Sequence, residues 1–374
     1  MHKKFFETKI EDLKAQNIYR SLRISDVLNH TQIRQNDKEF ISFCSNDYLG
    51  LSQNSEVKKA AISAIEKYGF GAGSSRYISG NNSLYQKLEN HLAKIKNCED
   101  AIVFGSGYLS GVSTIAALAH KSDLIIADKL IHSCLIDGAK LSGAKLLRFN
   151  HNDIAHAQKI LENNRKKYQK CLIITETVFS MDGDLGKLPE LLDLALKFGC
   201  LIVSDDAHGL GIIKHNFPEK FADLHLQIGT LSKAVGGYGG YVCGSKTTID
   251  YLRNFAKSAI YSTALPPAIL AGNLQALEII ENDKKLGAKT LENAQYFCEL
   301  LNLEKPQSAI VVLIIGDAKK TLEMAQSLEK SGFLISAIRP PTVEKGKSRL
   351  RITFNSNHKK SDIEALAKLL KAAK

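Results

Sequence analysis

The sequence lacks the features that mark membrane, secreted and metal-bound proteins. No apolar run in its 374 residues approaches the about 18 residues that a membrane-spanning helix needs. Residues 1–16, MHKKFFETKIEDLKAQ, have neither the apolar core nor the cleavage site of a secretory signal. The seven cysteines are odd in number and none stands in a C-x-x-C pair, which predicts free thiols and no zinc site. We therefore expect a cytoplasmic protein without a membrane segment or a bound metal.

Signatures of nucleoside triphosphate and nucleic-acid binding are also missing. No G-x-x-x-x-G-K-[ST] motif occurs. The net charge is +11, and residues 319–374 hold 13 Lys or Arg against 5 Asp or Glu, so +8 lies in this stretch. No zinc finger, RNP-like run or interleaved aromatic pattern accompanies that charge. We expect a solvated basic face and no nucleic-acid partner.

The middle of the chain alternates between predicted strands and helices. Such alternation is typical of a mostly parallel sheet covered by helices. Strands are predicted at residues 101–104, 123–127, 145–149, 171–175, 200–204 and 226–230. Helices are predicted at 8–28, 55–68, 83–96, 268–282, 318–331 and 359–373, with further strands near 39–44, 309–315 and 349–354.

The length allows two or three domains. Pro266 and Pro267 favour the end of one element and the start of a helix, which suggests a boundary there. We predict an N-terminal helical segment over 1–45, a large domain over 46–265 and a smaller α+β domain over 266–374.

Lys233 stands in an unusual setting, in the run GTLSKAVGGYGG of residues 229–240. The four glycines after it indicate a sharply bent backbone or the close approach of something flat and bulky. A lysine that is partly desolvated can act as an amine nucleophile. By itself, however, the run is more typical of an ordinary glycine-rich loop with a surface lysine.

Polar and titratable residues follow the predicted strands. The carboxyl ends of parallel strands meet at one edge of a sheet, and ligands bind there. The residues at these ends are Asp128, His132, Glu176, Ser180, Asp205, Asp206, His208 and Lys233. The sequence therefore predicts a site at this edge.

The run GSGYLSG, residues 105–111, follows a strand and opens a helix. Backbone N–H groups at such a turn bind phosphate. With Asp128 about twenty residues on, as in a dinucleotide fold, the run suggests a nicotinamide dehydrogenase. The match is imperfect because Ser110 occupies the position of the third glycine.

The combination of these features favours pyridoxal phosphate. That cofactor needs a lysine for a Schiff base, an aspartate to keep the pyridine nitrogen protonated, and donors for the phosphate. It also needs a flat group over the ring. Lys233, Asp205, the turn at Gly107 and two histidines supply the set in order.

The chain resembles the α-oxoamine synthases, fold-type I pyridoxal-phosphate enzymes, along essentially its whole length. The motifs are SNDYLGL, GSGYLSG, ETVFSMDGD, VSDDAHGLG, TLSKAVGG, YSTALPP and RLRIT, in the order of the family. The resemblance implies an α/β fold with a large, mostly parallel seven-stranded sheet and a smaller C-terminal α+β domain.

The resemblance also implies roles for individual residues. Lys233 would form the Schiff base, and Asp205 and His132 would complete the catalytic set. The implied cofactor-binding residues are Gly107, Tyr108, His132, Ser180, Asp205, His208, Thr230, Lys233, Ser262 and Thr263, the last two reaching the partner subunit's cofactor phosphate. The implied substrate-binding residues are Arg20, Asn46, Arg351 and Thr353.

Within that family, SNDYLGL, IYSTALPP and IRPPTV are most similar to members that join L-alanine to a pimeloyl thioester in biotin synthesis. Such enzymes are homodimers with shared sites. Alternatives are relatives that use glycine or serine, and, distantly, the dehydrogenase. The acyl donor is a CoA ester or an acyl carrier protein, and the basic C-terminal region could dock the acidic carrier. Tyr85 stands where the family commonly has histidine.

Overall fold

In the computed structural model of this chain, residues 2–214 and 217–372 are described. The chain forms two compact units. The smaller unit contains residues 1–50, 181–183 and 288–374, and the larger contains 51–180 and 184–287. Predicted boundaries at 45 and 265 differ from these, because residues 266–287 pack in the larger unit. None of the helices in the described ranges is long and apolar enough to cross a membrane.

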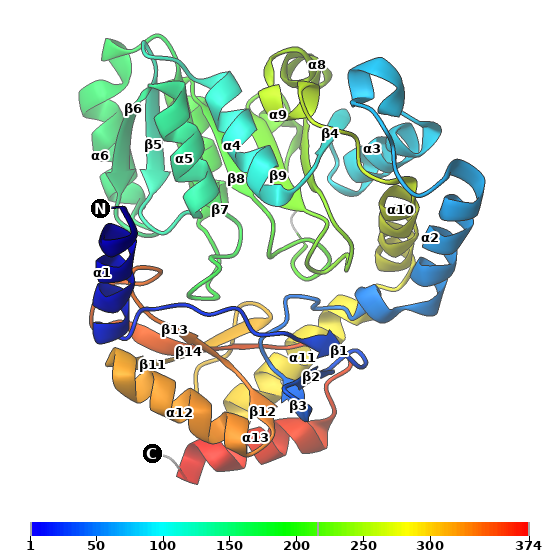
Figure 1. The fold of residues 1–374 in the computed structure, drawn as a ribbon. Helices are drawn as coiled ribbons and strands as arrows, with labels where there is room; N and C mark the ends of the chain where they lie inside the picture. The colour runs from blue at the N-terminus through cyan, green and yellow to red at the C-terminus, as the bar shows by residue number, and fades with distance from the viewer. Residues whose placement is uncertain (1, 215–216, 373–374) are drawn as a thin grey trace. The chain divides into compact units, whose positions relative to one another are not determined.

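The larger unit is built on a seven-stranded sheet, as predicted (Figure 1). Neighbouring strands are parallel except β10, which runs antiparallel to both β4 and β9. In spatial order the strands are β4 (Asp100–Phe104), β10 (Gly240–Gly244), β9 (His225–Thr230), β8 (Leu201–Asp205), β7 (Cys171–Glu176), β5 (Leu124–Asp128) and β6 (Lys145–Phe149).

Both faces of this sheet are covered. Side chains alternate between the faces, so Ile125 and Ala127 pack in one core cluster while Leu124 and Ile126 pack in another. This double burial explains why the central strands are almost continuously apolar in sequence. The helices between the strands are α4 (Gly107–Leu118), α5 (Ser133–Ser142), α6 (Ile154–Asn164), η3 (Arg165–Lys167), α7 (Leu188–Phe198) and η4 (Glu219–Phe221).

Further helices complete the larger unit. They are η1 (Leu51–Gln53), α2 (Ser55–Tyr68), η2 (Arg76–Gly80), α3 (Ser83–Ile95), α8 (Lys246–Phe255), α9 (Lys257–Ile260) and α10 (Pro267–Asn282). Side-chain caps define their starts: Asn54 Oδ1 accepts from the backbone N of Glu56 at 2.8 Å, and Asn82 caps α3 in the same way. The helix predicted over 55–68 therefore begins and ends where its sequence signals indicated.

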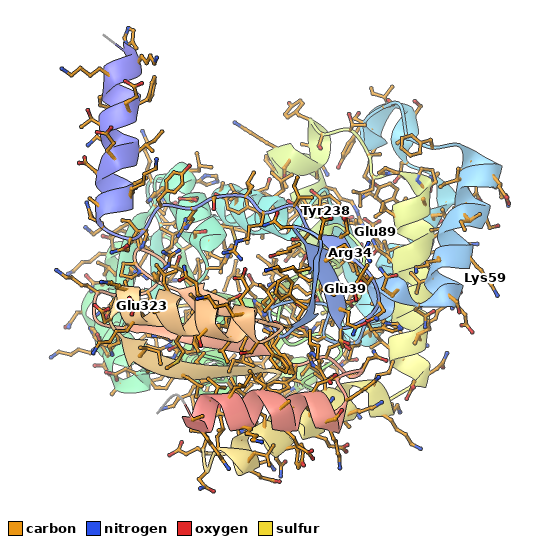
Figure 2. The ribbon with its side chains drawn as sticks, turned by 60° about the horizontal axis from the view of Figure 1, so that its bottom comes forward. Arg34, Glu39, Lys59, Glu89, Tyr238 and Glu323 are labelled. Atoms are coloured by element: carbon orange, nitrogen blue, oxygen red, sulfur yellow. The ribbon has the colours of Figure 1, made fainter. Side chains whose placement is uncertain are left out.

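The smaller unit contains two small sheets. One has the order β1 (Asp26–Val27), β2 (Gln32–Gln35), β3 (Lys38–Ser42), β12 (Phe333–Leu334), and the other β11 (Ile310–Gly316), β14 (Ser348–Thr353), β13 (Ser336–Ile338). Its helices are α1 (His2–Ala15), α11 (Lys285–Leu300), α12 (Ala318–Lys330) and α13 (Lys360–Ala372), with the unit boundary falling in the first turn of α11. Arg34 of β2 and Glu39 of β3 stand opposite each other and form an exposed ion pair at 2.8 Å (Figure 2).

The helix predicted over 8–28 is wrong in its extent, since α1 ends at Ala15 and residues 26–42 contain strands. The helix is closed by Asn17, which adopts the left-handed conformation with φ 57°. The backbone N–H groups of Ile18 and Tyr19 then both donate to the carbonyl of Leu13. The apolar spacing that suggested a longer helix does not reflect packing, because no residue of α1 is buried.

Candidate active site

Lys233 lies in a tight turn just after β9. The backbone N of Gly236 donates to its carbonyl at 2.8 Å, and the Lys233 amine lies 2.8 Å from Nε2 of His208. The glycines after Lys233 are required by the backbone conformation of the turn and by the protein atoms packed against it. Gly236 has φ +74° and an added Cβ would lie 2.3 Å from the backbone N of Ser52, while one at Gly237 would lie 1.9 Å from Oδ1 of Asn273. The close approach inferred from the sequence is therefore made by neighbouring protein atoms.

Asp205 ends β8 and is buried next to Lys233. Within the described ranges its carboxylate accepts one hydrogen bond, from the backbone N of Ala207 at 2.9 Å, so acceptor capacity remains. Burial raises the pKa of Asp205; the lysine opposes the shift and the neighbouring Asp206 adds to it. A cationic partner at this carboxylate would offset the cost of keeping it charged.

His132 precedes α5 and caps it, with Nδ1 accepting from the backbone N of Cys134 at 3.3 Å. Desolvation by its surroundings lowers the pKa of His132, Asp205 opposes this shift and Lys233 adds to it. A neutral ring is suited to stack on an aromatic ligand. Its backbone N donates to Oε1 of Glu176 at 2.5 Å.

Glu176 lies beside the candidate site, and the sequence did not indicate which groups its carboxyl group contacts. It ends β7 in register with Asp205 and is buried, and burial together with the Asp205 charge raises its pKa well above the usual range. The backbone N–H groups of His132 and Ser180 both point to its carboxyl group. Glu176 thereby joins these two residues at the sheet edge. Its place at a strand end was the signal available in the sequence.

A helix N-terminus lies at the same edge. Ser106 caps α4, with Oγ accepting from the backbone N of Leu109 at 3.2 Å. An added Cβ on Gly107 would lie 2.8 Å from Cβ of Thr230, so the first turn of α4 packs directly on the end of β9. Thr230 Oγ1 donates to the carbonyl of Gly239 at 2.9 Å. Free N–H groups and the helix dipole make such a turn suited to phosphate.

Tyr108, the second residue of α4, packs edge to face against His132 with ring centroids 6.5 Å apart. Its hydroxyl donates to Asp137 at 2.6 Å. Ser262 lies beside the same turn, since its Oγ is 3.9 Å from an added Cβ on Gly105, and Thr263 forms a bridge with Ser75. The expected reach of Ser262 and Thr263 to a partner subunit stays a prediction.

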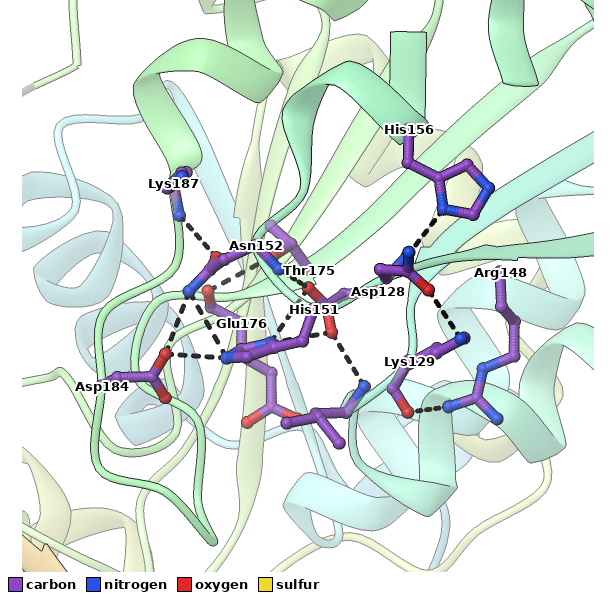
Figure 3. A network of polar contacts seen from close by, with 12 residues as sticks. Asp128, Lys129, Arg148, His151, Asn152, His156, Thr175, Glu176, Asp184 and Lys187 are labelled. Atoms are coloured by element: carbon purple, nitrogen blue, oxygen red, sulfur yellow. Dashed lines mark hydrogen bonds and ion pairs between the residues drawn. The ribbon is translucent and has the colours of Figure 1, made fainter. Parts of the chain in front are cut away.

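The loop that carries Ser180 is held by a network around His151 (Figure 3). His151 Nδ1 lies 3.1 Å from the buried carboxylate of Asp128, and Nε2 lies 2.7 Å from Asp184. Asn152 Nδ2 donates to Asp184 and to the carbonyl of Leu185, each at 3.0 Å. Asp128 also accepts from the backbone N of Asn152. Its carboxylate is thus engaged within the protein, which argues against the ribose-binding role of the dehydrogenase alternative.

His151 should make the stability of the protein depend on pH. Burial by itself would lower its pKa, but hydrogen bonds and charges from Asp128 and Asp184 overcome that effect and raise the pKa of His151 to about 10. Since an unfolded histidine has a pKa of about 6.5, this raised value stabilises the fold fully below about pH 6.5 and the contribution is lost as pH rises through about 10. We expect a contribution on the order of 4 kcal/mol at pH 6.5.

Urea unfolding followed by circular dichroism measures this contribution. The difference in stability between the wild type and His151→Gln should shrink steadily from pH 6.5 to pH 10. His156→Gln is the control, because no ion pair within the described ranges involves His156. A His151→Gln difference that stays constant across this range would contradict the assignment.

In the smaller unit, the predicted substrate residues Arg351 and Asn46 lie together. Nη1 and Nη2 of Arg351 each lie 3.2 Å from Asn46 Oδ1, and the guanidinium also reaches the hydroxyl of Tyr48 at 3.5 Å. Burial raises the pKa of Tyr48 to about 12, with Arg351 opposing the shift. Thr353, on the same strand, donates to the carbonyl of Ser45 at 2.8 Å. Arg20 has a different partner, Thr342, at 2.9 Å.

Tyr85 has a packing function in the larger unit. It is buried, its hydroxyl accepts from the backbone N of Leu265 at 2.6 Å, and the guanidinium of Arg76 lies 3.9 Å from its ring centroid. Arg76 in turn pairs with the buried Glu89 at 2.6 Å. These contacts hold the Gly- and Ser-rich loop before α3 against the chain that leads into α10.

The residues at the sheet edge fit pyridoxal 5′-phosphate. They combine an amine on a tight turn, a buried carboxylate with remaining acceptor capacity, a ring suited to stacking and a capped helix N-terminus. An α/β sheet that presents these groups at the carboxyl ends of its strands defines the class of fold-type I pyridoxal-phosphate enzymes.

Comparison with known proteins agrees. The model of the family Aminotransferase class I and II matches residues 38–370. The putative 8-amino-7-oxononanoate synthase of Parvibaculum lavamentivorans is 44% identical over 98% of this chain and 96% of its own length. The 8-amino-7-oxononanoate synthase of Beijerinckia indica is also 44% identical, over 97% of this chain and 95% of its own.

Solved structures show the same fold. The serine palmitoyltransferase of Sphingomonas wittichii superposes with a TM-score of 0.91 at 27% identity, covering 98% of this chain and 96% of that one. The 8-amino-7-oxononanoate synthase of Francisella tularensis gives a TM-score of 0.75 at 31% identity, covering 89% and 97%. The chain therefore belongs to the class I and II aminotransferase family and, within it, to the 8-amino-7-oxononanoate synthases.

Proposed function

We propose that this chain condenses L-alanine with a pimeloyl thioester, releasing CO2 and the free thiol and yielding 8-amino-7-oxononanoate for biotin synthesis. The observation that carries the proposal is the Lys233–His208 contact beside the buried Asp205, in a chain 44% identical to synthases of that name. The cofactor is pyridoxal 5′-phosphate, as in a serine palmitoyltransferase structure solved with it. When bound, it draws electrons from the reacting Cα of the amino acid.

The residues of the larger unit hold the cofactor in this proposal. Asp205 keeps the pyridine nitrogen protonated, and His208 and Ser180 hydrogen-bond the ring hydroxyl. The turn at Gly107 and the hydroxyl of Thr230 hold the phosphate. Tyr108 contacts the ring and phosphate at the start of α4, and the neutral His132 stacks on the ring and donates a hydrogen bond to the thioester oxygen.

Lys233 would anchor the cofactor covalently, and its amine would take the Cα proton of L-alanine. Arg351 binds the carboxylate of L-alanine and so orients the Cα–H bond, with Asn46 and Thr353 around it. Arg20 is a further substrate-binding residue in this proposal. The family motifs that contain these residues support the proposed roles.

Replacing Arg351 by lysine should weaken alanine binding selectively. Lysine keeps the charge but loses the planar pair of donors, and it removes the guanidinium from Asn46 Oδ1, which also accepts from the hydroxyl of Tyr48 at 3.1 Å. We expect KM for L-alanine to rise about 30- to 100-fold, corresponding to about 2–3 kcal/mol, with a smaller change in kcat. Arg34→Lys, which alters an exposed ion pair of the same unit, is the control. An unchanged KM in Arg351→Lys would assign the carboxylate to another residue.

We further propose a cytoplasmic homodimer in which Ser262 and Thr263 contact the partner's cofactor phosphate. Size-exclusion chromatography with light scattering measures the dimer.

The basic residues of 319–374 would favour an acidic acyl carrier protein as the acyl donor. Equal turnover of carrier-bound and CoA-bound pimeloyl groups at low and high salt would contradict that use of the charge.

The test of the overall function compares amino acids. Visible absorption spectra of the purified protein with pyridoxal phosphate, recorded with L-alanine, glycine or L-serine, should change at the lowest concentration with alanine. Condensation with pimeloyl-CoA should follow the same order. Serine is the competitor to examine, since serine palmitoyltransferases superpose with a TM-score of 0.91. A response mainly to glycine or serine would keep the family and change the substrate, and no absorption change at all would refute the cofactor.

A further inference from the structure

A buried ion pair involves Asp206, the residue that follows Asp205 of the proposed site. Lys96 Nζ donates to Oδ2 of Asp206 at 2.6 Å, and the two side chains are only 8% and 1% exposed. Asp206 follows Asp205 in sequence but does not share its role. Charges that are this deeply buried are costly unless they are paired, so the pair needs an explanation.

The other atoms of Asp206 are also engaged. Thr177 Oγ1 donates to Oδ1 at 2.5 Å, and the backbone N of Asp206 donates to the carbonyl of Ile228 at 2.7 Å. Thr177 also uses its backbone N to bind the carbonyl of Asp205 at 2.9 Å. An added Cβ on Gly209 would come 2.1 Å from Oδ1, so the carboxylate fits only because this residue is glycine. Residues 205–206 are therefore held from several sides.

Lys96 reaches Asp206 from a different part of the larger unit. It caps the C-terminal end of α3, and its carbonyl accepts from Nε2 of Gln227 on β9 at 3.1 Å. Lys94, two residues earlier, instead pairs on the surface with Glu281, and its side chain is 69% exposed. The two lysines stand close in sequence in opposite environments, which provides a matched control.

We propose that Lys96 is a positioning residue of the cofactor site, which acts through Asp206 to fix the Asp205 carboxylate and which balances the negative charge of Asp206 beside it. This inference rests on the proposed function, because it assigns Asp205 to the pyridine nitrogen. Within the described ranges, the titratable groups that act on Asp206 include Lys96, Asp205 and the hydroxyl of Tyr241; Lys233 and His132 act on Asp205 as well.

Removing the charge of Lys96 and removing that of Asp206 should shift the pKa at Lys233 in opposite directions, because the two charges have opposite signs. Lys96→Met removes the positive charge that pairs with Asp206, which should favour the protonated form of the linkage at Lys233 and raise its pKa. Asp206→Asn leaves the positive charge of Lys96 and lowers that pKa. The double variant removes both charges. At the distances within such a site each single change is worth roughly half to one pKa unit.

In the experiment, each protein is loaded with pyridoxal phosphate and its visible absorbance is recorded as a function of pH. The proteins are the wild type, Lys96→Met, Asp206→Asn, the double variant and Lys94→Met. Equilibrium dialysis of the apoproteins measures cofactor affinity. We expect opposite pKa shifts in the single variants, a return toward wild type in the double variant, and about tenfold weaker binding in Lys96→Met. Lys94→Met should behave as wild type, and Lys96→Arg should restore the wild-type titration.

Shifts of the same sign in both single variants, or no shift in either, would mean that the pair only stabilises the fold and would overturn the inference. An equal shift in Lys94→Met would do the same. A wild-type protein that forms no Schiff base would refute the proposed function, and that failure is recognisable because it affects every variant alike.

Discussion

Lys233→Ala should abolish condensation, with kcat falling at least about 10³-fold, because the variant loses both the covalent anchor of the cofactor and the amine that takes the Cα proton. The fold should survive. The Lys233 side chain is half-buried and its amine contacts His208 within the site, so its removal leaves the core intact. Product formation from L-alanine and pimeloyl-CoA measures the loss.

The control for that substitution is Lys59→Ala. Lys59 lies on α2, is exposed and points away from the ribbon (Figure 2). It should leave turnover within about twofold of wild type, since isolated surface changes have small effects. Borohydride reduction of the loaded protein, followed by peptide mass analysis, should label the Lys233 peptide in both the wild type and Lys59→Ala. Undiminished turnover in Lys233→Ala would refute the assignment of this lysine.

Asp205→Asn should lower kcat about 10³-fold while preserving the shape of the side chain. Asparagine can still accept from the backbone N of Ala207. It carries no charge, however, so it cannot keep the pyridine nitrogen protonated, and the cofactor then draws electrons less strongly. The loss should be visible before any thioester is added, as slower exchange of the Cα proton of L-alanine in D2O by NMR.

A surface aspartate provides the comparison for that result. Asp193 on α7 pairs with Lys220 at 3.5 Å, and its side chain is 68% exposed. Asp193→Asn should exchange and condense as wild type does. If Asp205→Asn exchanged the proton at the wild-type rate, the pyridine nitrogen would have to be held by a different residue.

The strands and helices of the larger unit could be predicted because their signals are local. Apolar runs of the length of a strand, bounded by turns, predicted the parallel core, and the helix predicted over 55–68 is α2 of the structure. The end of α1 could not be predicted in this way. Residues 18, 22 and 27 continue the helical spacing of apolar residues, but Asn17 turns the chain and no partner buries that face.

The sequence alone determined the class of fold, the candidate lysine and the set of polar residues at the strand ends, because motif order and strand periodicity are local properties of the chain. Tertiary structure decided which neighbours those residues have. The pairing of Lys96 with Asp206 joins residues 110 positions apart, and the carboxyl group of Glu176 accepts from the backbone N of His132, 44 positions earlier in the chain. Burial and charge compensation depend on distances across the fold, so pKa shifts and the positioning of Asp205 arise only when the strands pack together.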